Sequence, residues 1–234
     1  QNYSVALIEG NSDRNIDVGF LIKKNLNFFF DIETNKNRPL SYLHAHEQLS
    51  LSTNYPVKKI PHLFSRDCAE LKLFKKSNTN PFLVLFLTHL KSRLDPERID
   101  PGGTERRTAE LKAVIDIYSE SQKKYLQTPT LVCGDMNGFA GRPQTDEEFL
   151  RIYKDTDLVD VLELDEVKAE ERATFYQIRN NKSEGKQIDY CFLSKSAQLH
   201  LKKKSSSVYR YKDAQKLEKD RPLKLDDKLN LPSD

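Results

Sequence analysis

The tetrapeptide GDMN offers a carboxylate and a carboxamide, Asp135 and Asn137, directly after a short apolar run. Residues two apart on an extended backbone face the same side, so both side chains can address one group of substrate atoms. A carboxylate can orient or deprotonate a water molecule, and a carboxamide can donate a hydrogen bond to a phosphoryl oxygen. A Gly-Asp pair after a strand is more often only a turn, so this motif alone leaves both interpretations open.

A second motif, THLKSR, supplies His89, Lys91 and Arg93 after the most apolar segment of the chain. A histidine at a strand end is more often a capped surface residue than a catalyst. Here, however, three cationic or potentially cationic side chains stand close together beside a candidate acidic motif. Phosphate recognition is the most economical interpretation of that combination.

Three further residues are weak signals when each is considered alone. Arg66 stands in FSRD immediately before an apolar run, Asp189 opens another run in QIDYCFLS, and Asp234 ends the chain. An Asp that opens a strand can simply cap it, and an Arg there can be a solvated edge charge.

The elements that must position these residues show strand and helix patterns in alternation. A helical spacing of apolar residues predicts a helix from Thr104 to Tyr125, between two of the expected strands. This order is consistent with a right-handed crossover between neighbouring parallel strands, and both His89 and Asp135 follow a strand of that unit. Short apolar runs bounded by turn residues predict six strands, over Val5–Ile8, Val18–Ile22, Ala69–Phe74, Pro81–Thr88, Thr130–Cys133 and Ile188–Leu193.

Other segments carry weaker structural signals. Residues Asp146–Leu164 are typical of a helix at first, and the LVDVLEL segment at their end fits a helix end or a short strand. Residues Ser92–Gly103 indicate a Pro/Gly loop, and Lys202–Asp234 form a Lys-rich stretch with few apolar residues.

Composition sets broad limits on the class of protein. With 234 residues, of which 37% are hydrophobic and 31% charged, the chain can bury one sizeable core, so we expect a single domain. A formal net charge of +3 is too small to indicate nucleic acid by itself. No apolar stretch is long enough for a membrane span, so we expect a soluble protein. The compartment stays open between the cytoplasm and secretion after loss of a leader.

Cysteine usage favours free thiols over a disulfide or a metal site. Cys68, Cys133 and Cys191 are odd in number and widely spaced, and the last two lie inside apolar runs. No CxxC or Cys/His spacing accompanies them, so we expect buried, unpaired thiols.

The ordered set NSDRNIDVGFLI, FSRD, LTHLKSR, GDMN, QIDYCFLS and a final SD resembles the endonuclease/exonuclease/phosphatase superfamily. Its members include deoxyribonucleases, abasic-site endonucleases, sphingomyelinases and inositol-polyphosphate phosphatases. The match runs in order across essentially the whole chain and is most similar to bacterial members, except that Thr88 replaces their usual Asn. The resemblance implies an α/β fold: a four-layer α/β sandwich of two packed mixed β-sheets flanked by helices, with the site at one end.

The same resemblance implies roles for the candidate residues. Asp135 would orient the attacking water and Asn137 would bind the scissile phosphoryl group. Asp189 would brace the histidine of the family's terminal SDH motif. His89 would hold a phosphate oxygen with help from Arg66, and Asp234 would contact a Mg²⁺ or Mn²⁺ ion. Lys91 of THLKSR is a further candidate for substrate binding because of its positive charge.

Two residues of the family pattern have no counterpart in the sequence. The SDH histidine would follow Asp234, and the metal-binding Glu of the LQE motif would precede Gln1, with Glu9 belonging to a later segment. We therefore expect the domain, residues 1–234, to lack its N-terminal strand or strands and this histidine. The chain as it stands is then expected to hydrolyse phosphoesters poorly.

The resulting hypothesis is divalent-metal-dependent hydrolysis of phosphodiester bonds, preferably in nucleic acid, by a monomer. One alternative is a phosphomonoester or phospholipid phosphatase of the same superfamily. Another, from a different class, is a catalytically inactive binding or scaffold protein on this fold. Because the interior motifs are intact, we favour the enzyme over the scaffold.

Overall fold

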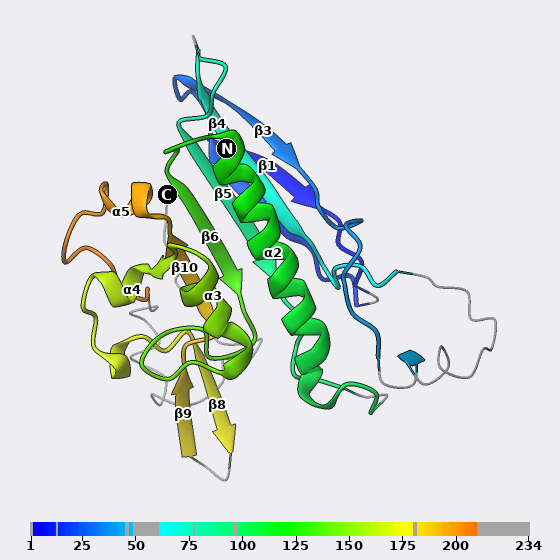
Figure 1. Cartoon of the computed structure of the whole chain (residues 1–234). Helices are drawn as coiled ribbons and strands as arrows, with labels where there is room; N and C mark the ends of the chain where they lie inside the picture. Colours follow the sequence, from blue (N-terminus) through cyan, green and yellow to red (C-terminus); the bar gives the residue numbers. More distant parts are fainter. Residues whose placement is uncertain are drawn as a thin grey trace.

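The computed structural model describes residues 2–12, 14–44, 47–48, 61–76, 78–95, 98–179 and 182–209. In these residues the chain forms a six-stranded sheet and two antiparallel strand pairs, with helices around them (Figure 1). The expected α/β class is confirmed.

The six-stranded sheet has the strand order β3-β4-β5-β6-β10-β7 and is mixed. Only β5 and β6 run parallel among its described neighbours, and the other pairs are antiparallel. Its strands are β3 (Phe28–Glu33), β4 (Cys68–Lys75), β5 (Leu83–His89), β6 (Thr130–Asp135), β7 (Val159–Asp160) and β10 (Asp189–Leu193). The parallel pair lies at the centre, so the ends of β5 and β6 meet at one edge of the sheet.

Helix α2 (Thr104–Lys124) connects β5 to β6 and covers one face of the sheet (Figure 1). Its inward residues Leu111, Val114 and Tyr118 join Val84 and Phe86 of β5 in the main hydrophobic core. The free backbone amides at its start are satisfied by the Asp100 carboxylate, which accepts from Glu105 and Arg106. The predicted strand, helix and parallel strand are confirmed.

The hairpin of β1 (Tyr3–Ile8) and β2 (Val18–Lys23) packs against the opposite face of the sheet. Val18, Phe20 and Ile22 of β2 point inward at a spacing of two, as expected for a strand with one buried face, and meet Ala69 and Leu71 of β4. The sandwich of two packed sheets with flanking helices is therefore confirmed, and its smaller sheet is antiparallel in the described residues.

The helix expected from Asp146 is interrupted, and the LVDVLEL segment contains both of its alternatives, a short strand and a short helix. The structure has η2 (Glu147–Phe149), α3 (Leu150–Asp155), β7 and α4 (Val161–Leu164) in its place. Asp160 explains the break because it is fully buried, and its carboxylate accepts hydrogen bonds from Gln187 and the Cys191 amide. These contacts hold residues 159–160 as a strand beside β10.

The remaining elements are short. They are η1 (Pro101–Gly103), η3 (Ala169–Glu171), β8 (Phe175–Arg179), β9 (Lys182–Lys186) and α5 (Lys195–Gln198). Strands β8 and β9 form a hairpin that projects from the body (Figure 1). Within the described ranges, no helix combines the length and apolar character needed to cross a bilayer.

All three cysteines are free, as predicted. Cys68 is buried, whereas Cys133 and Cys191 are only partly buried, which corrects the expectation that both lie fully inside. They are partners in the register of β6 and β10, and their sulfur atoms are 3.2 Å apart.

Candidate active site

Three strand termini bring candidate catalytic side chains into one row. His89 ends β5 and pairs in register with Asp135, which ends β6, and Asp135 in turn pairs with Asp189 at the start of β10. The His89 Nε2 atom lies 3.6 Å from Asp135 Oδ2, and both side chains are partly exposed. Residues separated by up to 100 positions in the sequence thus become neighbours across three strands.

The glycine of GDMN is required by the close approach of β5 and β6. Gly134 has a φ of 139°, and a Cβ atom there would lie 1.7 Å from the carbonyl oxygen of Thr88. After it, Asn137 adopts a left-handed φ of 53°, a conformation that Asn tolerates better than most residues. The Asn137 amide donates to Asp135 Oδ1 at 2.7 Å, so the two residues of the motif fix each other.

The carbonyl oxygen of Leu90 joins two of the candidate residues. The Asn137 carboxamide donates to it at 3.0 Å, and Arg66 Nη1 donates to it at 3.3 Å. Arg93 supports the same loop, because its Nε donates to the Asn137 carbonyl while its Nη2 pairs with Asp146 at 2.6 Å. Arg93 is therefore a positioning residue for the GDMN turn.

Arg66 is a buried cation with spare hydrogen-bonding capacity. Its residue is 2% exposed, and its Nε atom has no hydrogen-bond partner. Burial and the nearby charge of Arg14 lower its pKa, although Glu110 and Asp135 oppose the shift. A buried guanidinium with an unsatisfied donor is the kind of group that binds an anion.

Glu110 of α2 holds the two cationic motifs in place. Its fully buried carboxylate accepts from the Ser65 amide at 2.7 Å and from the Lys91 amide at 2.6 Å. One oxygen also lies 3.5 Å from Arg106 Nε. One side chain of the crossover helix thereby fixes the backbones next to Arg66 and His89.

The protonation of His89 and Asp135 is shifted toward the neutral forms. Burial and then the charge of Arg66 lower the pKa of His89 to about 4. Burial raises the pKa of Asp135, with a further contribution from the negative charge of Asp189 and opposition from the Asn137 amide. At neutral pH the imidazole is uncharged and can either donate or accept a hydrogen bond.

Other sequence-predicted residues are placed differently. The Lys91 ammonium donates to the Ser92 and Leu94 carbonyls of its own loop, at 3.3 and 2.5 Å. Thr88 is buried, and its hydroxyl donates to the Asp67 carbonyl. Asp234 lies outside the described residues.

Sequence reasoning did not single out Arg14, although it lies in the quoted NSDRNIDVGFLI segment. Its positive charge contributes to the lowered pKa of both Arg66 and His89. The preceding loop docks on the Arg66 segment, where a Cβ at Gly10 would lie 2.9 Å from the Arg66 Cα. Only this tertiary contact distinguishes Arg14 from an ordinary surface arginine.

Comparisons with known proteins show the fold. No protein-family model and no curated protein sequence matches the chain. The chain is similar to the human Nocturnin catalytic domain with bound sulfate anion, with 15% identity and a TM-score of 0.51 over 83% of this chain and 61% of that one. It is also similar to D. rerio TDP2 complexed with single strand DNA product, with 16% identity and a TM-score of 0.51 over 84% of this chain and 64% of that one.

A third similar structure is the mannosyl-6-phosphatase of Bacteroides thetaiotaomicron, with 14% identity and a TM-score of 0.50 over 83% of this chain and 64% of that one. The chain has the endonuclease/exonuclease/phosphatase fold. It spans 61 to 64% of the length of these three structures. In this fold the row of His89, Asp135 and Asp189 lies at one end of the central sheet.

Proposed function

We propose that the protein is a divalent-metal-dependent phosphoester hydrolase that acts on phosphodiester bonds of nucleic acid. The observation that carries the proposal is the meeting of a buried, incompletely satisfied Arg66 with His89, Asp135, Asn137 and Asp189. Hydrolysis of a phosphoester needs charge on the phosphoryl oxygens to be neutralised and a water to be oriented, and this group contains residues suited to both tasks.

The donor chemistry of the site fits a hard dication. Asp135 and Asp189 are register partners, and the charge of Asp189 contributes to the raised pKa of Asp135. A cation between or beside the two carboxylates would relieve that repulsion, and oxygen ligands are those that Mg²⁺ and Mn²⁺ prefer. When bound, the ion would polarise a phosphoryl oxygen. We propose Mg²⁺ or Mn²⁺ as the ion.

Each remaining side chain has a role suited to its position. Asp135, held by the Asn137 amide, would orient the attacking water and accept its proton. Arg66 would place its positive charge near a phosphate oxygen, and neutral His89 would donate a hydrogen bond to it. Asn137 would contact the phosphoryl group through its carboxamide, and Lys91 would add positive charge after leaving its loop carbonyls.

The charge around the site and the similar structures both bear on the substrate class. A nucleic acid is favoured because the similar TDP2 structure contains a single-strand DNA product, and because Arg14, Arg66 and Lys91 carry positive charge around the site. The similarity to a mannosyl-6-phosphatase favours a phosphomonoester as the second candidate.

A substrate panel tests the proposal. The protein would be incubated with Mg²⁺, with Mn²⁺ or with EDTA, and with single-stranded DNA, plasmid DNA, RNA, a sugar 6-phosphate and sphingomyelin. We expect weak but measurable metal-dependent cleavage of a nucleic acid. Release of phosphate only from the sugar phosphate would replace the substrate class, and the absence of metal-dependent hydrolysis in every arm would contradict the enzymatic proposal and favour the scaffold.

A further inference from the structure

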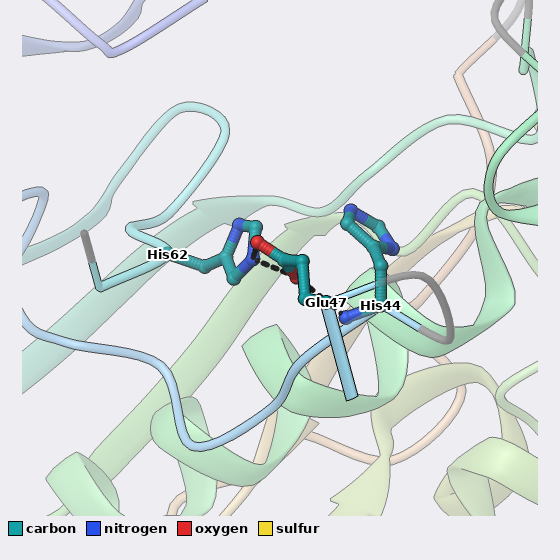
Figure 2. Close-up of side chains that lie close together, drawn as sticks. All are labelled: His44, Glu47 and His62. Atoms are coloured by element: carbon teal, nitrogen blue, oxygen red, sulfur yellow. Dashed lines mark hydrogen bonds and ion pairs between the residues drawn. The ribbon is translucent and has the colours of Figure 1, made fainter. Parts of the chain in front are cut away.

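A second group of possible metal ligands lies outside the row of His89, Asp135 and Asp189. The side chains of His44, Glu47 and His62 converge so that one ligand atom of each lies within 4.8 Å of the others (Figure 2). His62 Nε2 is 2.8 and 3.0 Å from the two carboxylate oxygens of Glu47. All three residues are partly buried, so they are shielded without being closed to an ion from solvent.

The backbone around this group is fixed by its own hydrogen bonds. The His44 amide donates to Glu47 Oε2 at 2.6 Å, and the Glu47 amide donates to the His44 carbonyl at 3.0 Å. The His62 carbonyl accepts from the Leu40 amide at 2.7 Å, which joins the two ends of the segment. Tyr42 packs against both imidazoles, with ring centroids 4.4 Å from His62 and 5.2 Å from His44.

Helix α2 contributes a fourth polar group. Glu105, in its first turn, has a carboxylate oxygen 3.7 Å from His44 Nδ1. A carboxylate next to a ligating histidine typically orients the ring, or it can itself complete a coordination shell. Arg106 strengthens the same junction, because its guanidinium donates to the Leu63 carbonyl at 2.9 Å.

The ligand types indicate the class of metal. Two imidazoles and one carboxylate form a set that suits Zn²⁺ and similar transition metals, whereas Mg²⁺ selects oxygen ligands. We propose that His44, Glu47 and His62 bind a transition metal of the Zn²⁺ class, with Glu105 or a water at the fourth position. An ion pair between Glu47 and His62 accounts for two of these residues, and a shared metal accounts for the convergence of all three.

The position of this site gives it a structural role. Bound metal would join His44, Glu47 and His62 to the first turn of α2. Glu110 of the same helix fixes the Arg66 and His89 segments. The ion would therefore stabilise the scaffold of the proposed active site without contacting the substrate. This inference is independent of the proposed hydrolysis, because it concerns different residues and a different class of ion.

Metal titration tests the inference directly. Metal-stripped protein would be titrated with Zn²⁺ by calorimetry and with Co²⁺ by visible absorption, which reports tetrahedral coordination. We expect one tight Zn²⁺ site per chain. The variants His44→Ala, Glu47→Gln and His62→Ala should each bind Zn²⁺ more than about tenfold more weakly, since even changes to residues outside the coordination shell cost about 10- to 100-fold. The matched control is His200→Ala, which removes an exposed histidine outside the group.

Folding controls keep each outcome interpretable. Circular dichroism would show whether each variant folds, and Glu47→Gln preserves size while removing the charge. Undiminished Zn²⁺ binding in folded Glu47→Gln and His62→Ala, or no Zn²⁺ binding by the wild type, would overturn the inference. Because these readouts do not involve hydrolysis, they distinguish a failure of this site from a failure of the proposed function.

Discussion

Removal of the Glu110 carboxylate should both destabilise the protein and loosen the segments that carry the site residues. Glu110→Ala leaves the Ser65 and Lys91 amides without their acceptor in a fully buried position, and it removes the partner of Arg106. Each buried amide that loses its partner costs about 1 to 3 kcal/mol, so the two amides together cost about 2 to 6 kcal/mol. We therefore expect a loss of about 2 to 6 kcal/mol in the free energy of unfolding.

Thermal unfolding followed by calorimetry measures this loss. For a domain of this size, each kcal/mol shifts the melting temperature by about 2 to 4 °C, so a fall of roughly 4 to 24 °C is expected. The matched control is Glu120→Ala on the same helix, which removes an exposed pair with Arg38 and should cost at most about 1 kcal/mol. If Glu110→Ala shifts the melting temperature no more than Glu120→Ala does, the buried carboxylate does not hold these motifs.

Three further results are expected. Gly134→Ala should fail to fold or lose more than about 4 kcal/mol in the free energy of unfolding, because its Cβ would meet the Thr88 carbonyl at 1.7 Å. The control Gly102→Ala meets only the Thr104 hydroxyl at 3.6 Å and should be tolerated far better. Comparable unfolding curves for the two variants would contradict the packing of β5 against β6. Because the folded-state pKa of His89 is depressed to about 4, its stability contribution is present above about pH 6.5 and is lost as pH falls toward 4; an NMR titration that gives an ordinary imidazole pKa would refute this. Cys68 is fully buried and its pKa is raised, so it should react with a thiol reagent only when the protein unfolds. Rapid labelling of the native protein that disappears in the Cys68→Ser variant would contradict the burial of Cys68 in the core.

The central unit of the fold could be predicted from the sequence because its signals are local. The run from Phe82 to Leu87 is covered on both faces, and the helix from Thr104 has an apolar stripe that packs on it. GDMN was identified through its place in an ordered set of motifs, and the structure explains its glycine by one close contact with Thr88. Strand β3 was missed because its burial does not alternate. Four of its six residues are exposed, namely Phe29, Phe30, Asp31 and Glu33.

The parts that could not be predicted from the sequence depend on contacts between distant segments. Nothing in the pattern around Glu110 distinguishes it from a solvated helix residue, yet it is buried against Ser65 and Lys91. The group of His44, Glu47 and His62 has no recognised ligand spacing, and its members lie up to 18 positions apart in the sequence. Long-range closure of this kind is invisible to periodicity.

Hydrolysis of single-stranded DNA by a matched pair of variants tests the central claim most directly. Asp135→Asn changes the carboxylate of the site, and Asp155→Asn changes an exposed aspartate of α3 that pairs only with Arg151 among the described ion pairs. Under single-turnover conditions with Mg²⁺, we expect Asp135→Asn to lower the rate by about 10² to 10⁴, and Asp155→Asn to leave it unchanged. Equal rates for wild type, Asp135→Asn and Asp155→Asn would contradict the assignment of this strand-end row as the active site.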